Sequence, residues 1–423
     1  MTDTPRQFDI VLVGATGFTG RLTARHLADH APAEVRIALA GRSRERLEAV
    51  RAGLGRRAED WPLLVVDTLD DDAVADLAAR TRVVATAVGP YLRYGLPLVR
   101  ACAAAGTHYC DLTGEVLFIH RSIAENHDTA RASGARIVHA CGFDSVPSDL
   151  AVLLAAEAAQ TDGADLGTTR LAVRSLRTSP SGGTVETARG IADEMRSSAT
   201  SRRIMGDPWA LAEGPRPSRP ASSRARRGGI GGAVDRVLRA SPVRRDPDNG
   251  HFTGPFVMAS FNTRVVARSA SLLGYGEGFR YAEYSDFGSG ARGAVTAGLV
   301  SAALVAGVAG LAFGPTRAVL DRVLPAPSEG PSEESMAKGR FLMEVTAEAT
   351  NGARYRADVG ARMDPGYAGA AVMFGQAALA LVLDGDRLPP TEGGVLTPAT
   401  AVGHPLVERL REHGFTLEAA RLP

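Results

Sequence analysis

Residues Phe8–Gly20 read FDIVLVGATGFTG, an apolar run that passes directly into a glycine-rich turn. The spacing of the apolar residues that follow predicts a helix over Leu22–His30. Glycines at these intervals let the backbone turn tightly and approach a pyrophosphate, and the first turn of the helix offers free N–H groups to the anion. A strand, a glycine turn and a helix in this order are typical of a dinucleotide-binding unit. The predicted cofactor-binding residues of the turn are Gly14, Ala15, Thr16, Gly17, Phe18, Thr19 and Gly20.

The same alternation continues through the first third of the chain. Short apolar runs occur at Val35–Ala40, Leu63–Val66, Val83–Val88 and Ile137–Ala140. Segments with helical spacing lie between them, at Arg44–Leu54, Leu96–Ala105 and Val116–Ala132. This pattern predicts an α/β fold, in which residues 1–150 form a doubly wound, Rossmann-type parallel sheet with helices on both faces.

The pattern changes after residue 150. Thr169–Leu176 is typical of a strand and Val185–Ser197 of a helix. Phe341–Ala349 and Arg354–Gly360 form a predicted hairpin, because the Asn351-Gly352 pair between them favours a tight turn. We therefore expect a second, α+β domain over residues 151–390 that contains an antiparallel sheet. Residues 391–423 are expected to pack back on the first domain.

The composition excludes several classes of protein. The 423 residues are 45% hydrophobic and 22% charged, so the chain is not predominantly disordered. Its 48 basic and 47 acidic residues leave a net charge of +1, which excludes a general polyanion binder, and we expect no nucleic-acid partner. The chain has three cysteines, none in C-x-x-C spacing, and no apolar leader follows its N-terminus. These features predict a cytoplasmic protein without disulfides.

Arg42 follows the second predicted strand, 22 residues after Gly20. An acidic residue at this place would bind the ribose 2′-hydroxyl of NAD, whereas a guanidinium grips a 2′-phosphate. Ser43 adds a hydroxyl donor, so the sequence predicts NADPH/NADP as the cofactor. Asp67 closes the third predicted strand. It either accepts a hydrogen bond from the adenine amino group or caps a helix, and both alternatives stay open.

Further motifs follow the later strands. They read AVGPYLRYG at Ala87–Gly95, GTHYCDLTGE at Gly106–Glu115 and CGFDSVPSD at Cys141–Asp149. With the glycine turn, these segments closely resemble the saccharopine dehydrogenase-like oxidoreductases. Later segments of the chain also look like motifs of that family, namely Gly330–Ser332, Asp364–Tyr367 and Gly393–Thr400. The best match is the bacterial branch that includes the trans-acting enoyl reductases, which act with polyketide synthases in building long-chain cell-envelope lipids.

The resemblance implies an NADPH-dependent reductase of a carbon–carbon double bond in a lipid-like (polyketide or fatty acyl) thioester, with an acyl-carrier or polyketide synthase partner. Such a reduction needs hydride delivery to the β-carbon and a donor for the developing enolate oxygen. Ligands of parallel sheets bind beyond the carboxyl ends of the strands. The residues expected to lie against the nicotinamide are Val88, Gly89 and Pro90. The candidate catalytic residues are Tyr91, Tyr94 and Asp144.

Each of these candidates has a structural alternative, because tyrosines in turns often pack and aspartates often cap helices. The nine histidines show no H-E-x-x-H or other metal spacing, and no metal site is predicted. Two other functions remain open. One is a saccharopine-type oxidoreductase of amino-acid imines, which would need several convergent arginines. The other is a non-catalytic, membrane-associated scaffold that binds a dinucleotide.

Residues 293–316 contain 24 residues without a charge. Small side chains recur at every fourth position and form a ridge, which comprises Ala294, Gly298, Ala302, Ala306, Gly310 and Gly314. The segment is a buried or dimer-interface helix, a surface that contacts a membrane or a lipid substrate, or a transmembrane span. We favour close helix packing and expect a homodimer, while peripheral contact with the inner face of the plasma membrane stays open.

Residues 215–247 form an expected mobile loop rich in arginine, proline, serine and glycine. Between residues 216 and 245 it carries nine arginines and one aspartate, a local net charge of +8. The loop contacts an acidic lipid or an acidic carrier protein, or is simply solvated.

Overall fold

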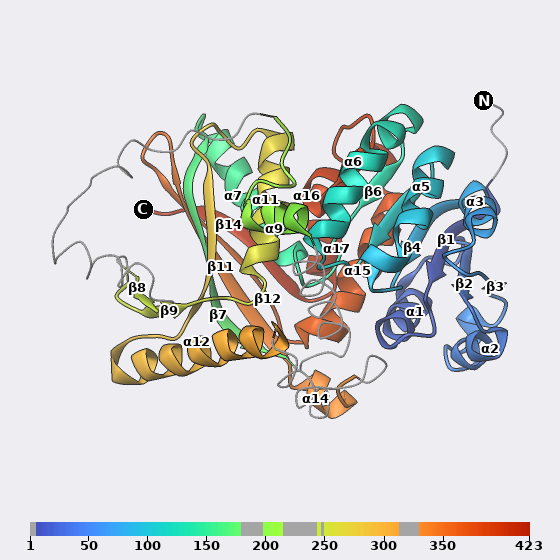
Figure 1. The fold of residues 1–423 in the computed structure, drawn as a ribbon, viewed down its shortest axis with the longest axis horizontal. Coiled ribbons are helices and arrows are strands. Elements are labelled where there is room, and N and C mark those ends of the chain that lie inside the picture. The colour runs from blue at the N-terminus through green and yellow to red at the C-terminus, as the bar shows by residue number, and fades with distance from the viewer. Residues whose placement is uncertain (1–5, 179–197, 215–242, 247–248, 313–329) are drawn as a thin grey trace.

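The computed structural model describes residues 6–178, 198–214, 243–246, 249–312 and 330–423. A first sheet of seven strands lies toward the right of Figure 1. Its strands are β1 (Phe8–Val13), β2 (Ile37–Gly41), β3 (Leu63–Val65), β4 (Thr81–Thr86), β5 (His108–Asp111), β6 (Arg136–Val138) and β13 (Gly394–Leu396). All neighbours are parallel, in the order β13-β6-β5-β4-β1-β2-β3. The predicted Rossmann-type sheet is confirmed, with β5 as a strand that the apolar pattern did not reveal.

Helices cover both faces of this sheet. They are α1 (Phe18–His30), α2 (Arg44–Ala52), α3 (Asp71–Ala79), α4 (Tyr91–Tyr94), α5 (Leu96–Ala105), α6 (Val116–Ser133) and the short η1 (Arg56–Ala58). Alternate residues of β1 belong to two different cores: Ile10 and Leu12 lie in the one that contains α1, and Val11 and Val13 lie in the one that contains α3, α5 and α6. The double winding therefore follows from the two-residue period of the strand.

The second sheet, toward the left of Figure 1, also has seven strands. They are β7 (Leu166–Arg177), β8 (Arg244–Arg245), β9 (Phe252–Gly254), β10 (Arg280–Asp286), β11 (Arg340–Ala349), β12 (Arg354–Ala361) and β14 (Phe415–Arg421). Their order is β14-β12-β11-β7-β10-β9-β8, and only β7 and β10 pair in parallel among these strands. The predicted hairpin is present, with Gly352 at a φ of +81° and the Asn351 side chain accepting from the Ala353 N–H at 2.9 Å.

The remaining helices connect and cover the two sheets. They are α7 (Val146–Thr161), α9 (Ala199–Gly206), α11 (Ala259–Leu273), α12 (Gly290–Ala312), α14 (Glu333–Ala337), η3 (Pro365–Gly369), α15 (Ala370–Leu383), η4 (Gly385–Arg387), α16 (Pro398–Ala401) and α17 (Gly403–Glu412). Residues Pro365–Leu383 are long and apolar enough to span a membrane, but 78% of that window is buried. In this fold α15 is a core helix, packed against α1, α17 and the first sheet.

Several predicted features lie at the edges of the described chain. The predicted helix Val185–Ser197 lies outside the described residues, as does most of the arginine-rich segment 215–247. The C-terminal segment contributes to both sheets, because β13 pairs with β6 and β14 pairs with β12. Its last strand therefore belongs to the second sheet, not the first.

The apolar helix α12 buries a different face from the expected one. Gly293, Ala297 and Ser301 form the buried stripe, and α12 packs there against β9. Ala302 and Ala306 of the predicted ridge are exposed, and the larger Leu299 is 67% exposed. Ala302 and Ala306 therefore do not pack within the described chain, whereas residues 313–316, with Gly314 of the ridge, lie outside the described residues. Contact of this face with a second subunit or with lipid stays a prediction.

We expect Ala297→Leu to lower the free energy of unfolding by about 1–3 kcal/mol, because Ala297 is fully buried and has no room for three more carbons. Ala302→Leu is the matched control on the exposed face, and a change within about 0.5 kcal/mol is expected. Urea denaturation of both variants measures the difference. Equal losses would contradict the assignment of the buried face, and a monomer formed by Ala302→Leu alone, seen by light scattering, would place the ridge in a subunit contact.

Candidate active site

The glycine turn after β1 has the shape that a dinucleotide needs. Gly14 has a φ of +82°, and a Cβ there would lie 2.7 Å from Val88 Cγ2. A Cβ on Gly20 would lie 2.1 Å from the Gly14 carbonyl oxygen, so only glycine lets α1 approach the turn. Gly17 is exposed, and no side chain caps α1 there. The N–H groups at the start of α1 are therefore open to an anion, and the turn fits a pyrophosphate.

The other residues of the turn are held by their neighbours. The N–H groups of Gly14 and Ala15 both donate to the Ala40 carbonyl of β2, at 2.9 and 3.3 Å. Arg21 donates to the Thr16 carbonyl at 2.8 Å, and the Thr23 hydroxyl donates to the Thr19 carbonyl at 2.9 Å. The Phe18 ring meets the edge of Tyr367 at a centroid distance of 4.9 Å, and Gly330 also packs against it. The second half of the chain thus covers one wall of the turn.

The end of β2 places Arg42 beside the turn. A Cβ on the preceding Gly41 would be 3.8 Å from the Thr16 side chain. Arg42 is exposed and makes no hydrogen bond or ion pair with any described residue. The Ser43 side chain caps α2 by accepting from Arg46 N–H at 3.3 Å. A free guanidinium at this place fits a 2′-phosphate.

Asp67 does not cap a helix. Its carboxylate accepts from the Leu69 N–H at 3.0 Å, and Asp70 is the residue that caps α3. The helix-cap alternative for Asp67 is therefore wrong, because the chain makes one more turn before α3 begins. Asp67 is exposed, and its contact with adenine stays a prediction.

The end of β4 leads through Val88, Gly89 and Pro90 into the short helix α4. A residue that sequence reasoning missed, Glu115, holds the start of this helix: its two carboxylate oxygens accept from the N–H groups of Tyr91 and Leu92, both at 2.8 Å. Glu115 is 4% exposed. A buried carboxylate is well placed there, since α4 turns its N-terminal N–H groups toward it.

Tyr91 is bonded within the fold. Its hydroxyl donates to the Thr86 carbonyl at 3.1 Å and accepts from the Leu112 N–H at 3.2 Å. Desolvation raises the pKa of Tyr91 well above its usual value, and the charge of Asp111 adds to the effect. The geometry therefore favours a positioning role for Tyr91 between β4 and the loop after β5.

Asp111 at the end of β5 is the centre of a buried network. One carboxylate oxygen accepts from the Tyr109 hydroxyl at 2.9 Å and lies 2.7 Å from Nδ1 of His139. The other accepts from the N–H groups of Thr113 and Ala140, both at 3.0 Å. Sequence reasoning placed Asp111 at a strand end but did not identify this role. The polar D-L-T-G-E run after a buried strand was the available signal.

Two candidate groups are left with polar atoms free for a ligand. Tyr94 is partly exposed, its ring lies under the Arg93 guanidinium at 5.0 Å, and its hydroxyl bonds to no described residue. Asp144 follows β6 and lies beside Gly114, whose Cβ would be 3.4 Å from the carboxylate. No described residue donates to Asp144, and burial raises its pKa to about 6. A carboxyl of this kind can hold or release a proton near neutral pH.

A second buried network joins the loop that carries Asp144 to the second sheet. The Ser145 hydroxyl donates to Asn262 at 3.0 Å, and the Asn262 amide donates to Ser148 at 3.1 Å and to Glu283 at 2.9 Å. Tyr281 donates to Glu283 at 2.7 Å. Desolvation raises the pKa of Glu283 to about 7. These contacts tie α7 and α11 to β10 directly behind Asp144.

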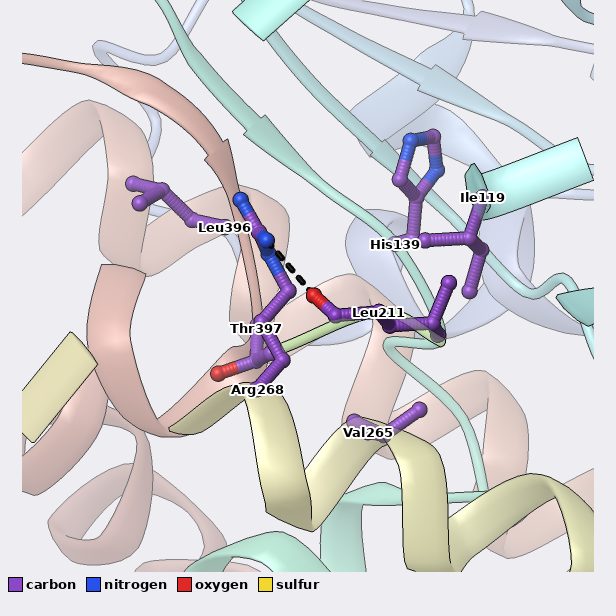
Figure 2. Close-up of a pocket in the computed structure, with 7 residues that line it drawn as sticks. All are labelled: Ile119, His139, Leu211, Val265, Arg268, Leu396 and Thr397. Carbon is purple, nitrogen blue, oxygen red and sulfur yellow. Dashed lines mark hydrogen bonds between the residues drawn. The ribbon is translucent and has the colours of Figure 1, made fainter. Parts of the chain in front are cut away.

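A small cavity lies between α6, α11 and Thr397, the residue that follows β13 (Figure 2). Its wall is mostly apolar, formed by Ile119, Val265 and other side chains. The buried Arg268 borders it and donates to the carbonyls of Leu211 and Val395, at 2.7 and 2.6 Å. Because this guanidinium is occupied by backbone oxygens, the cavity is a structural feature and not a site for a carboxylate.

Comparison with known proteins agrees with this geometry. Residues 10–138 match the family model described as the saccharopine dehydrogenase NADP-binding domain. A provisionally named trans-acting enoyl reductase of Mycobacterium tuberculosis is 45% identical over 433 residues, and the trans-acting enoyl reductase of Mycobacterium ulcerans is 43% identical over 431; each alignment covers 100% of both chains. Apo saccharopine dehydrogenase (L-Glu forming) from Saccharomyces cerevisiae superposes with a TM-score of 0.54 at 15% identity, covering 98% of this chain and 100% of that one. The last similarity shows the fold.

We expect Arg42→Ala to weaken NADPH binding roughly ten- to a hundredfold, because one charge-assisted contact to the 2′-phosphate is lost. NADH binding should be nearly unchanged. Arg56→Ala, which removes another exposed arginine beyond the far end of α2, is the matched control and should leave both cofactors unaffected. Fluorescence titration measures all the constants, and equal losses for NADPH and NADH in Arg42→Ala would refute the assignment.

Asp144 also makes a pH-dependent prediction. Its pKa is raised from 3.8 to about 6 in the folded protein, so the ionised form destabilises the fold, and the penalty appears as the pH rises from about 4 to about 6. Asp144→Asn should match the wild type near pH 4 and be more stable at pH 8, by up to about 2 kcal/mol, since partial exposure reduces the effect. Denaturation at the two pH values tests this, and a variant less stable than the wild type at pH 8 would contradict it.

Proposed function

The chain belongs to the trans-acting enoyl reductase family, and we propose that it reduces the carbon–carbon double bond of an acyl thioester with NADPH. The NADP-binding domain makes the protein an NADP-dependent oxidoreductase. When bound, NADPH supplies the hydride. The glycine turn and Arg42 would hold its phosphates, and the strand end at Val88–Pro90 leaves backbone beside the turn for the nicotinamide.

The observation that carries the proposal is the free hydroxyl of Tyr94. Tyr91 and Tyr109 at the same edge of the sheet use their hydroxyls inside the fold, whereas Tyr94 bonds to no described residue. A neutral phenol can donate to the thioester oxygen as negative charge develops on it. The Arg93 guanidinium lies over the ring at 5.0 Å, and this cation–π contact holds the Tyr94 side chain in place.

Asp144 is proposed to manage the proton that completes the reduction. Its carboxyl has no hydrogen bond from the described residues, and burial holds its pKa near 6. In the protonated form it can give a proton to the α-carbon or to a water molecule beside it. Ser145 and the network behind it hold this loop in place.

Three arginines of the second sheet and of α11 are occupied within the fold and are not available to the carboxylates of an amino-acid imine. Arg264 and Arg268 of α11 donate to backbone carbonyls, and Arg174 pairs with Asp286 and Glu344. An amino-acid imine would need guanidinium groups free to bind its carboxylates. An acyl chain needs none, which supports the enoyl substrate.

We also propose that the thioester is lipid-like and is presented by a carrier protein or a polyketide synthase, as the trans-acting designation of the relatives suggests. A cytoplasmic location and a role in cell-envelope lipid assembly belong to the same proposal. The exposed apolar residues of α12, including Val295 and Leu299, support contact with an apolar partner.

The function is tested by NADPH oxidation with an enoyl thioester on coenzyme A or on an acyl carrier, and with an α-keto acid plus an amino acid. We expect turnover only with the enoyl thioesters, and Tyr94→Phe should lower kcat about a hundredfold while NADPH affinity is preserved. Turnover only with the keto acid and amine would establish the imine alternative. NADPH binding without any turnover would indicate the scaffold.

Tyr91→Phe is the control. Because its hydroxyl makes two internal hydrogen bonds, the change should lower the free energy of unfolding by about 1–2 kcal/mol. Tyr94→Phe should leave stability unchanged. Full turnover in Tyr94→Phe would remove this residue from the mechanism without changing the family assignment.

A further inference from the structure

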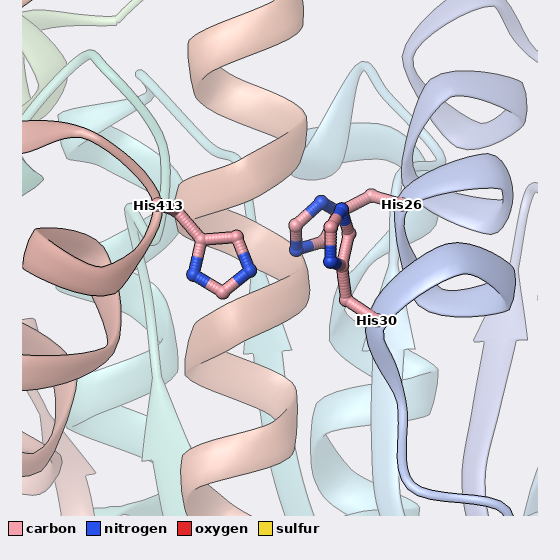
Figure 3. A group of neighbouring side chains, drawn as sticks. All are labelled: His26, His30 and His413. Carbon is pink, nitrogen blue, oxygen red and sulfur yellow. The ribbon is translucent and has the colours of Figure 1, made fainter.

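Three histidines meet far from the candidate active site. His26 and His30 lie one turn apart on α1, and His413 directly follows α17 (Figure 3). The ring centroids are 4.6, 4.8 and 5.1 Å apart, and one nitrogen from each ring lies within 4.8 Å of the others. We propose that these three imidazoles bind a divalent transition-metal ion, zinc above all, which links α1 to the end of α17.

The lone pairs of two rings already converge on one point. Nδ1 of His413 lies 2.7 Å from the Arg409 carbonyl, which can only accept, so Nδ1 carries the proton and Nε2 carries the lone pair. The Gln376 amide nitrogen lies 3.2 Å from this Nε2 and 2.8 Å from Nε2 of His26. An amide NH₂ only donates, so both imidazoles present a lone pair to it. The amide nitrogen therefore stands close to where a shared cation would sit.

The residues around the three histidines provide space, ring orientation and a balanced charge, as a metal site requires. A Cβ on Gly375 of α15 would lie 2.7 Å from His26 Cδ2, so glycine leaves the space that the ring fills. The carbonyl that accepts from His413 orients the ring, as such groups do around metal-bound histidines. The positive charge of Arg409 is paired with Asp384 at 2.7 Å. Desolvation, with His30 and His413 beside it, lowers the pKa of His26 to about 3, which keeps the ring neutral.

His30 completes the set. It is exposed, and its nitrogens bond to no described residue. Zinc needs nitrogens at about 2.0–2.1 Å, which places tetrahedral ligands about 3.4 Å from one another. Binding would require the nitrogens to move closer than the present 4.8 Å limit and the Gln376 amide to withdraw, and the exposed His30 ring is the one with room to rotate. Three imidazoles with water in the fourth position are an ordinary zinc site, and imidazole also suits copper, nickel and cobalt.

The predicted role is a structural clamp. His26 lies eight residues beyond Phe18, about 12 Å along α1 from the end that faces the glycine turn. The metal would join α1, which covers the first sheet, to the end of α17 across α15 (Figure 3). It should therefore raise stability and leave NADPH binding unchanged. Because metal-bound imidazoles must be unprotonated, binding should weaken as the solution is made more acidic.

The experiment uses the full chain without a histidine tag, stripped with EDTA and titrated with zinc by calorimetry. We expect about one zinc per chain with a Kd of about 10 μM or tighter, and a higher melting temperature with zinc. Cobalt(II) should give the visible absorption of a tetrahedral site. His30→Ala and His413→Ala should each weaken binding at least about tenfold and abolish the thermal shift.

His404→Ala is the matched control, because His404 is also exposed and pairs only with Glu157 among the described residues. It should bind zinc as the wild type does. His30 lies on the surface, so His30→Ala is expected to fold, and its NADPH titration checks this. No zinc binding below about 100 μM, or equal binding by the wild type and His30→Ala, would overturn the proposal.

Discussion

The edge of the first sheet that carries the candidate site depends on the buried carboxylate of Asp111. A fully buried charge is tolerated only when it is well paired, and Asp111 has four partners, at 2.7 to 3.0 Å. Those partners come from the ends of β5 and β6, so one group fixes both strand ends at once. Thr113 links Asp111 to Glu115, because the Thr113 hydroxyl accepts a hydrogen bond from the Glu115 N–H at 3.1 Å. Glu115 in turn holds α4, and α4 carries Tyr94.

Asp111 and Asp144 are two aspartates at one edge of the first sheet that lie in different surroundings. Asp111 is fully enclosed and surrounded by donors, so its charge is used entirely within the fold. Asp144 is half-buried and receives no hydrogen bond from the described residues, so desolvation raises its pKa to about 6. A carboxyl that the fold leaves without donors fits the role proposed for Asp144. The difference lies in the neighbours, not in the local sequence.

The parts that the sequence predicted well are those set by local rules. The glycine turn, the parallel strands and the hairpin at Asn351 follow from backbone freedom and apolar period, which are local properties. The parallel pairing of β7 with β10 joins segments far apart in the chain and has no local signal. For α12 the period of small residues was real, but which stripe is buried depends on β9, which the period does not contain.

The candidate site divides in the same way. Arg42 could be placed because its distance from the glycine turn is set by one strand and one helix. The role of Tyr91 could not, since its partners Thr86 and Leu112 are known only once the sheet is assembled. The histidine cluster is a mixed case. His26 and His30 have a helical spacing that the sequence displays, but His413 joins them only through the path of the C-terminal segment.

That C-terminal segment also connects the two sheets. Arg136 at the start of β6 donates to the carbonyls of Pro389 and Ala401, at 2.9 and 2.8 Å. Asp149 of α7 accepts from the Ala399 N–H at 2.8 Å. Beyond these contacts the chain enters β14 of the second sheet. Residues from the end of the chain thus fix α7, and hence the Asp144 loop before it, against the sheet that carries the glycine turn. A site formed between the two sheets needs them to be held in a fixed position relative to each other. The last two strands provide this constraint, because β13 pairs with the first sheet and β14 with the second.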